Sequence, residues 1–401
     1  KSSHILHHHK EMYFNKHCPL FLLLSCAVQK AISTETNNPE CEAFGPNILE
    51  LTTGAVKTCI DSTAYDGKRC FYTYVPDCAG EDAPLVFDIH GFSSCPFFSS
   101  AYTGWREKAD ENCFVLVWPL GNTDPMIADE TCFAVPGGLQ GIGEDSDFTS
   151  APCCCNGYLP SVPTDDPSFL RETAALIVRD IPMSSSNTIS IDTKRIYMAG
   201  HSNGCMTALS MAILHSDMVA AVGCHSGAAL TSFPDTYNPT PMMMIHGTAD
   251  QDVNYNGTEW YLSTLSQHNL LATKNKCTSN KQLLNLNESP VNNYTEYTAS
   301  SCENNATIVL LALDNVGHIP FPNLEGTSIP IEEGTDVTVI DTTQLAWDFM
   351  NKFSLDVPPV LEVSSEDEPV GDNTSSTSFS KDVSLLIRVF TSVMVASFSW
   401  A

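Results

Sequence analysis

The chain has 401 residues, of which 43% are hydrophobic and 16% are charged. That apolar fraction is normal for a globular protein, so it excludes a disordered or collagen-like chain. The 19 Lys and Arg residues stand against 47 Asp and Glu residues, which gives a formal net charge of −28. A chain this acidic is repelled by phosphate backbones, so no nucleic-acid partner is expected. The 16 cysteines exceed what a reduced cytosolic enzyme usually carries, and they predict an oxidising compartment.

Residues 1–27 have the pattern of a leader followed by a secretory signal peptide. Lys16 precedes the apolar run Pro19–Leu24, and Ser25-Cys26-Ala27 supplies the small-x-small pattern of a cleavage site. The apolar run is too short to span a bilayer. The alternative interpretation is a buried N-terminal helix. Removal of this segment leaves an even number of cysteines, which suits disulfide pairing.

Short strands and helices alternate along the middle of the chain. Strands are predicted at Cys70–Val75, Pro84–His90, Cys113–Pro119, Lys194–Ala199, Met218–Cys224, Pro241–His246 and Ala306–Asp314. Helices are predicted at Ser99–Asn112, Pro167–Ile181, Gly204–His215, Thr258–Asn269 and Thr342–Phe353. Most of the strands are continuously apolar, as strands buried on both faces are. The alternation therefore predicts an α/β fold, with a mostly parallel sheet and helices on both faces.

Two segments interrupt this alternation. Gly121–Asp166 is rich in Cys, Gly and Pro and is predicted to form a cap insertion over the strand ends, where open α/β sheets keep their sites. Lys276–Asn305 is a second insertion, which a disulfide between Cys277 and Cys302 could close. Sequence alone does not fix this pairing.

The segment Gly200-His201-Ser202-Asn203-Gly204 follows an apolar strand and opens a helix. This is the context of a nucleophile elbow, which holds a serine hydroxyl at the top of the sheet. Ser202 is therefore the predicted nucleophile. The alternative is an ordinary serine in a tight turn.

A serine nucleophile needs a general base and an acid that orients the base, and in this fold the chain order is Ser, acid, His. Only His268 and His318 lie far enough beyond Ser202 to be the base. His268 falls inside a predicted helix, whereas His318 follows the last strong strand. We therefore predict that His318 is the base.

The acid is expected just after the strand Pro241–His246. Asp250 is the first choice there, and Asp252 is the alternative. Asp314 also lies near His318, but too close in sequence to be the preferred orienting group. Either carboxylate after the strand could instead be a solvated turn residue.

The oxyanion hole needs two preorganised backbone donors. One is predicted to be the N–H of Asn203, directly after the nucleophile. The other is predicted to be the N–H of Phe92, in the loop after the strand Pro84–His90, where Gly91 allows a close approach.

No metal site is expected, because Cys153, Cys154 and Cys155 are adjacent and no CxxC pair has a matching partner. No cofactor is expected either, since the first strand lacks a phosphate-binding Gly-rich loop. Structural disulfides are the predicted use of the cysteines. Cys205 and Cys224 might pair or merely pack.

The C-terminal part has two predicted segments. Residues 356–383 form an acidic, Ser/Thr-rich linker that cannot bury a core. Residues 384–401 form a hydrophobic tail that fits a glycolipid-anchor signal, although Arg388 lies within it. A short amphipathic helix is the alternative. The glycosylation motifs fit an extracellular glycoprotein, and they begin at Asn256, Asn293, Asn305 and Asn373.

Taken in order, the motifs resemble the secreted esterases grouped with poly(3-hydroxybutyrate) depolymerases, feruloyl esterases and acetylxylan esterases. The matching segments are Pro84–Gly91, Gly104-Trp105, Phe114–Pro119, the Cys-Cys run before Asp165-Asp166, Phe169-Leu170-Arg171, Arg195–Gly204, His246–Asp250 and Gly317-His318. The resemblance runs from about Pro84 to Pro322, and residues 40–355 are predicted to form an α/β-hydrolase catalytic domain. The resemblance implies that the family's catalytic roles fall on Ser202, Asp250 and His318.

This sequence departs from the family pattern after the base. Ile319-Pro320-Phe321-Pro322 stands where an aromatic–Pro pair is usual, and Cys155 is extra. These differences bear on acyl or aryl specificity rather than on the triad. The resemblance therefore implies a secreted serine ester hydrolase that forms an acyl-enzyme on feruloyl, acetyl or short hydroxyacyl esters. The substrates would be cell-wall polysaccharide esters or polyhydroxyalkanoates.

Two other functions fit the same residues. A serine peptidase could use this triad on this fold, and a non-catalytic, anchored surface glycoprotein could retain the fold alone. An ester hydrolase should lose activity on acidification as His318 becomes protonated, with a midpoint near the ordinary histidine value of ~6.5.

Overall fold

The computed structural model describes residues 54–62, 67–92, 94–124, 130–133, 135, 165–184, 189–258, 261–285, 293–322 and 333–361. The predicted leader (1–27) and C-terminal tail (384–401) lie outside these residues, as do most of the predicted cap and linker. Among the glycosylation motifs, Asn373 also lies outside them.

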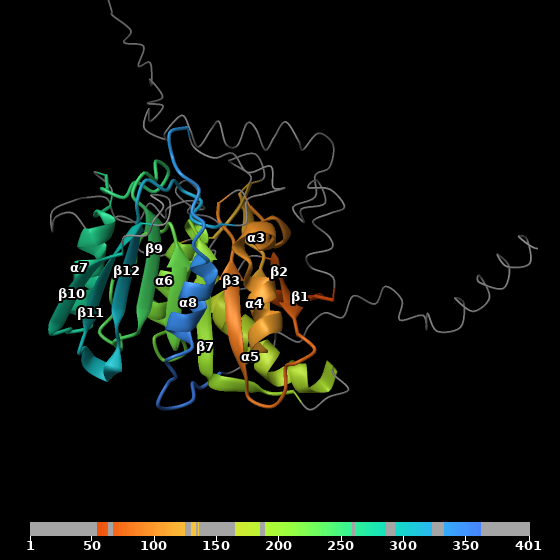
Figure 1. Ribbon diagram of the computed structural model, residues 1–401. Helices are drawn as coiled ribbons and strands as arrows, with labels where there is room; N and C mark the ends of the chain where they lie inside the picture. Colours follow the sequence, from red (N-terminus) through yellow and green to blue (C-terminus); the bar gives the residue numbers. More distant parts are fainter. Residues whose placement is uncertain are drawn as a thin grey trace, which may run out of the picture. The chain divides into compact units, whose positions relative to one another are not determined.

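A ten-stranded mixed sheet forms the centre of the described domain. Its strands, in spatial order, are β1 (Val56–Ser62), β2 (Gly67–Tyr74), β4 (Val115–Pro119), β3 (Ala83–Ile89), β7 (Ile191–His201), β8 (Ala221–His225), β9 (Met242–Gly247), β12 (Ile308–Leu313), β11 (Tyr294–Ser300) and β10 (Ser279–Asn285). The strands from β4 to β12 in this order are parallel, and antiparallel strands complete both sides. Figure 1 shows β1 and β10 at opposite sides of the sheet.

Helices cover both faces of this sheet. They are α3 (Pro96–Thr103), α4 (Trp105–Asn112), α5 (Asp166–Ser184), α6 (Asn203–Leu214), α7 (Thr264–Lys274) and α8 (Thr342–Met350). One hydrophobic core lies between the sheet and α5, α6 and α7, and the other lies between the sheet and α4 and α8. In Figure 1, α4 and α8 lie in front of the sheet. The predicted α/β architecture is therefore confirmed.

All seven predicted strands are present, and most of them have the continuous apolar run that burial on both faces requires. The predicted helix Ser99–Asn112 is instead two helices. Gly104 separates them in the left-handed conformation (φ 72°), which glycine adopts without the steric cost of a side chain. The helix predicted from Thr258 starts at Thr264, because Ser263 caps it by accepting the Ser266 N–H.

The second insertion is a β-hairpin made of β10 and β11, and β11 pairs with β12. A disulfide between Cys277 and Cys302 closes it, which is the pairing that the sequence left open. The open question about Cys205 and Cys224 is also answered, since they are bonded. Further disulfides join Cys59 to Cys70 and Cys78 to Cys113. Such disulfides persist in oxidising compartments.

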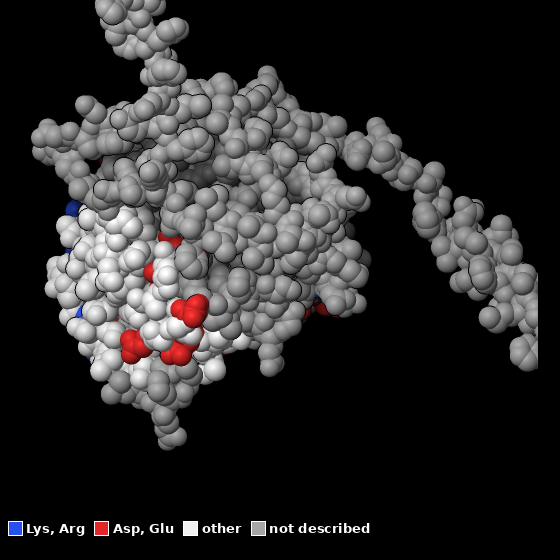
Figure 2. All heavy atoms as spheres, turned by 90° about the horizontal axis from the view of Figure 1, so that it is seen from above, with Lys and Arg blue, Asp and Glu red and all other residues white. Residues whose placement is uncertain are grey.

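Part of the first insertion is described. It contains a two-stranded ribbon of β5 (Asn122–Asp124) and β6 (Glu130–Cys132), followed by Phe133 and Val135. Within the described residues, no helix has both the length and the apolarity that a membrane crossing needs. Seen from above in Figure 2, the described surface carries several acidic side chains, while basic ones are visible only near its margins.

Candidate active site

Ser202 stands in a strained turn between β7 and α6. Its backbone dihedrals are φ 55° and ψ −118°, a conformation that non-glycine residues rarely adopt and that clusters at functional sites. The flanking glycines make the turn possible. A Cβ on Gly204 would lie 1.9 Å from the carbonyl oxygen of Ile89, and a Cβ on Gly200 would lie 2.6 Å from the carbonyl carbon of Gly204. This is the geometry of a nucleophile elbow.

Asp250 and His318 meet at the carboxyl ends of two neighbouring parallel strands. Asp250 follows β9 and His318 follows β12, and these strands end opposite each other at Gly247 and Leu313. The N–H of Ala249 donates to the carbonyl oxygen of Val316 at 3.0 Å, which joins the two loops. The Nδ1 atom of His318 lies 2.9 Å from Oδ2 of Asp250. The bond fixes the position of the imidazole of His318 relative to Asp250.

The carboxylate of Asp250 is buried and fully hydrogen-bonded. Its Oδ1 accepts the backbone N–H groups of Asp252 at 3.0 Å and Val253 at 2.8 Å. Its Oδ2 lies 3.1 Å from Nε2 of His246, in addition to its bond with His318. Burial alone would raise the pKa of Asp250. The charge of His318 and the hydrogen bonds from both histidines outweigh burial and hold this pKa well below its usual range.

His201 connects the elbow to the loop that carries His318. Its Nε2 lies 2.8 Å from the carbonyl oxygen of His318, and the two rings are 4.8 Å apart between centroids. Its Nδ1 lies 3.3 Å from the hydroxyl of Tyr102. Burial, followed by the charge of His318, holds the pKa of His201 well below its ordinary value. His201 is therefore neutral, and Ser202 follows it directly in the chain.

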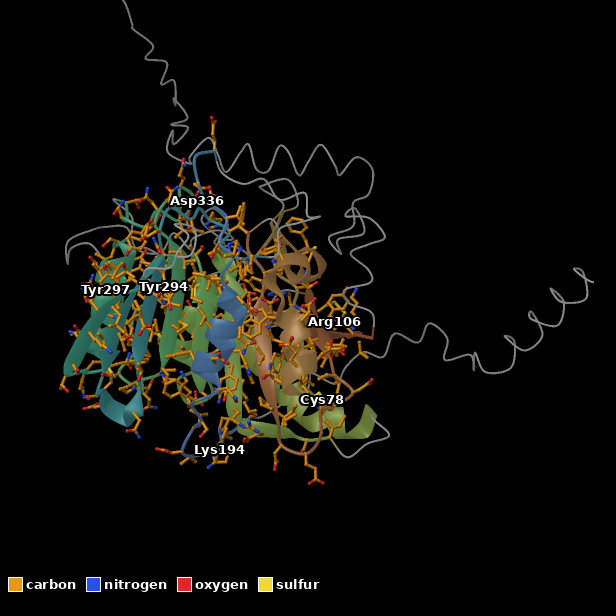
Figure 3. The ribbon with its side chains drawn as sticks, in the orientation of Figure 1. Cys78, Arg106, Lys194, Tyr294, Tyr297 and Asp336 are labelled. Carbon is orange, nitrogen blue, oxygen red and sulfur yellow. A yellow bond between two sulfur atoms is a disulfide. The ribbon has the colours of Figure 1, made fainter. Side chains whose placement is uncertain are left out.

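The His318 loop is also held from its outer side. The side-chain amide of Asn315 donates to the carboxylate of Asp336 at 3.2 Å, and the N–H of Asp336 donates to the carbonyl of Asn315 at 2.8 Å. In Figure 3, Asp336 lies at the top of the molecule, while Cys78 and Lys194 lie near the opposite end. The top is thus the end at which the parallel strands finish.

The loop predicted to contribute to the oxyanion hole lies against the elbow. A Cβ on Gly91 would lie 3.4 Å from Cβ of Ser202 and 3.4 Å from the carbonyl oxygen of His201, and Phe92 follows in a half-buried turn. Asn203 is the first residue of α6. Its backbone N–H therefore belongs to the helix turn whose donors have no partner within the helix.

The side chain of Asn203 has a role that the sequence did not reveal. Its Oδ1 accepts the N–H of Phe133 at 2.8 Å, and its Nδ2 donates to the carbonyl of Phe133 at 3.0 Å. The Phe133 ring packs on His90 at 4.8 Å. His90 in turn accepts the N–H of Gly121 through Nε2 at 3.0 Å. The base of the first insertion is thus fastened to both sides of the elbow.

The alternative residues lie in other surroundings. His268 is on α7 with Nε2 3.3 Å from the carbonyl of Ile308, which is at the start of β12 and far along that strand from His318. Asp252 donates its N–H to Asp250. The N–H of Asp314 donates to the carbonyl of Asn293 at 3.0 Å.

The departure after His318 is explained by packing. Phe321 is 1% exposed, and its ring lies against His225 at 4.3 Å, Tyr102 at 5.4 Å and His201 at 5.6 Å. This aromatic residue therefore supports the histidines beneath the elbow. No group of His, Cys, Asp and Glu side chains among the described residues is arranged to hold a metal ion.

The strand order, the turn between β7 and α6, and the Asp250–His318 pair at adjacent strand ends are the arrangement of the α/β-hydrolase fold. A curated relative agrees with the resemblance found in the motifs. It is a bifunctional acetylxylan esterase/xylanase of Neocallimastix patriciarum, 24% identical over 290 residues and 72% of this chain. The chain spans about a third (34%) of the length of that relative.

Solved structures with similar folds include two esterases. An acetyl xylan esterase of Aspergillus awamori is 13% identical and has a TM-score of 0.45, covering 68% of this chain and 96% of its own. A ferulic acid esterase of Anaeromyces mucronatus is 14% identical and has a TM-score of 0.38, covering 75% of this chain and 90% of its own. No family model matches the chain.

Proposed function

We propose that this chain is a serine carboxylic-ester hydrolase. The observation that supports it most is the 2.9 Å contact between His318 and Asp250, held against the Ser202 elbow by the bond from His201 to the His318 backbone. A serine, an imidazole and a buried carboxylate in this order form the set that nucleophilic acyl transfer requires.

In the proposed mechanism, Ser202 Oγ attacks the ester carbonyl while Nε2 of His318 takes the hydroxyl proton. The negative charge that develops on the carbonyl oxygen is stabilised by the N–H groups of Asn203 and Phe92. Collapse of the tetrahedral intermediate breaks the ester bond, and His318 returns the proton to the leaving alcohol. Water then attacks the acyl-enzyme by the same route, which releases the acid and restores Ser202. Asp250 stabilises the imidazolium throughout.

The proposed substrates are acetyl, feruloyl or short hydroxyacyl esters, on cell-wall polysaccharides or on polyhydroxyalkanoates. The similarity to an acetylxylan esterase/xylanase supports the polysaccharide esters. The motif resemblance supports the wider range of acyl groups.

We also propose that the protein is extracellular. Residues 1–27 would be removed as a leader and signal peptide, and residues 40–355 would form the catalytic domain. Residues 356–383 would form a linker to a tail (384–401) that a lipid anchor could replace. The disulfides support an oxidising compartment. The glycosylation motifs at Asn256 and Asn305 fall on exposed residues.

The test is hydrolysis of p-nitrophenyl acetate, methyl ferulate, acetylated xylan and hydroxybutyrate oligomers by the wild type and Ser202→Ala. We expect turnover that disappears in this variant. Ser216→Ala is a matched control, because Ser216 is buried beyond the far end of α6, where its hydroxyl accepts the Asn238 N–H. Peptide turnover without ester turnover would favour a peptidase. A folded wild type with neither activity would favour the non-catalytic glycoprotein.

A further inference from the structure

Asp250 binds a second histidine that the proposed mechanism does not use. His246 is the second-last residue of β9, and its side chain is 1% exposed. Its Nε2 lies 3.1 Å from Oδ2 of Asp250, the same oxygen atom that binds Nδ1 of His318 at 2.9 Å. One carboxylate oxygen therefore lies between two imidazoles.

The partners of His246 determine where its proton is. Nε2 also lies 2.7 Å from the carbonyl oxygen of Val253. Both neighbours of this nitrogen accept hydrogen bonds, so Nε2 carries the hydrogen and shares it between them. The other nitrogen, Nδ1, is buried with no hydrogen-bond partner among the described residues. A proton there would be a buried donor without an acceptor, which favours the neutral Nε2–H form.

The same hydrogen atom closes the turn that carries Asp250. His246 reaches forward to the Val253 carbonyl, and the Val253 N–H reaches back to Oδ1 of Asp250 at 2.8 Å. The carboxylate is therefore held from both of its oxygens by groups of its own turn. Its direction toward His318 is set before any substrate binds.

We propose that His246 is a positioning residue that fixes the direction of the Asp250 carboxylate and limits its basicity, and thereby tunes how strongly His318 holds a proton. The physical reason is that a donor on Oδ2 withdraws negative charge from the oxygen that faces His318. This proposal rests on the proposed function for its kinetic consequences.

Two histidines and a tyrosine packed near the pair have pKa values displaced away from the neutral range by burial. Burial lowers the pKa of His201, whose ring faces His318, and lowers the pKa of His225 beyond it to about 3. Burial raises the pKa of Tyr255, whose ring lies 5.9 Å from that of His246, to about 12. A change in the acidic limb of the rate profile therefore reports on the pair itself.

The experiment compares His246→Leu, which removes the donor, with His246→Gln, whose amide N–H can replace Nε2–H. We expect His246→Leu to lower kcat/KM by on the order of ten- to a hundredfold, through misplacement of the base. Its acidic limb should move to higher pH by roughly half a unit to one unit, the effect of one lost hydrogen bond to a buried carboxylate. His246→Gln should keep most of the rate and the wild-type limb.

His268→Leu is the matched control, because it removes another buried histidine that lies outside the site. It should change stability without moving the acidic limb. An unmoved limb in His246→Leu, or a His246→Gln variant that behaves like His246→Leu, would overturn the proposal.

A measurement on the wild type needs neither variants nor activity. Nitrogen NMR of the full chain should show His246 as the neutral Nε2–H tautomer, and the Nδ1–H form would overturn the proposal even if folding fails in both variants. If the wild type hydrolyses no ester, the proposed function fails. The tautomer, together with the titration of the His318 resonance in His246→Gln and His246→Leu, would still decide the role of His246.

Discussion

Asp88 is a carboxylate placed inside an apolar layer of the protein. It lies on β3 with no exposed surface, and its Oδ2 accepts bonds from Thr103 at 3.0 Å and from Trp118 at 3.1 Å. Its Oδ1 is buried with no partner among the described residues. Burial raises the pKa of Asp88 to about 7, against the smaller opposing effect of the two hydrogen bonds. The ionised form is therefore the one that folding disfavours.

The pH dependence follows from this direction. Because the pKa of Asp88 is higher in the folded than in the unfolded chain, protonated Asp88 contributes fully to stability below the unfolded pKa of about 3.9. This contribution is lost as the pH rises to the folded pKa of about 7. Asp88→Asn mimics the protonated acid at every pH. Its melting temperature should therefore exceed that of the wild type by a margin that grows from pH 4 to 7, reaching on the order of 5 °C and then levelling.

Thermal melts from pH 4 to 9 test this expectation, with the exposed Asp235→Asn as control. A constant difference across the range would show that Asp88 is ionised in the folded protein throughout.

At the scale of elements, the parallel strands were predictable and the edge strands were not. The parallel strands β4, β3, β8, β9 and β12 are buried along their whole length and β7 is buried over its second half, and their buried segments are mostly apolar because both faces of the sheet are covered. By contrast, β10 (SNKQLLN) is almost entirely exposed and has a polar sequence, so no hydrophobic period marks it. The turn at Ser202 could be predicted from its local sequence, and the pairing of Asp250 with His318 could be predicted from their order in the chain. The contacts of His246 and of the Asn203 side chain form only when the folded chain brings separate segments together, so the positions of these residues in the sequence did not predict them.

The contact between α6 and the segment after β6 makes an element-scale prediction. Asn203→Ala would leave the buried N–H and carbonyl of Phe133 without their partners, at a cost of about 1–3 kcal/mol in unfolding free energy. Turnover should also fall by about tenfold or more, because the elbow loses its brace.

Chemical denaturation and steady-state kinetics measure these two effects. Thr207→Val is the matched control, because it removes a buried hydroxyl from the same helix. This hydroxyl donates to the Asn203 carbonyl at 2.9 Å. Equal losses in the two variants would contradict a special role for the Phe133 contact.

At the scale of the whole molecule, the disulfides differ in what they support. Cys277–Cys302 closes the hairpin at one side of the sheet, as Figure 1 shows for β10 and β11. Cys205–Cys224 joins the helix that follows the elbow to β8, and both of its cysteines are buried.

We therefore expect a double Ser variant of Cys277 and Cys302 to lose hydrogen-exchange protection in β10 and β11 while keeping near wild-type turnover. Removal of Cys205–Cys224 should lower turnover and cost about 2–4 kcal/mol of global stability. Hydrogen exchange and ester kinetics on the two variants decide the matter. An inactive Cys277/Cys302 variant would mean that the hairpin supports the site.

From β3 onward, the spatial order β3, β7, β8, β9, β12 is also the order of synthesis. Each new parallel strand can therefore be added beside the previous one as the chain emerges. The proposed base comes 117 positions after His201, so a partly made chain would hold the proposed nucleophile without the group that deprotonates it. By the proposed mechanism, ester hydrolysis therefore cannot begin until the loop after β12 has been synthesised.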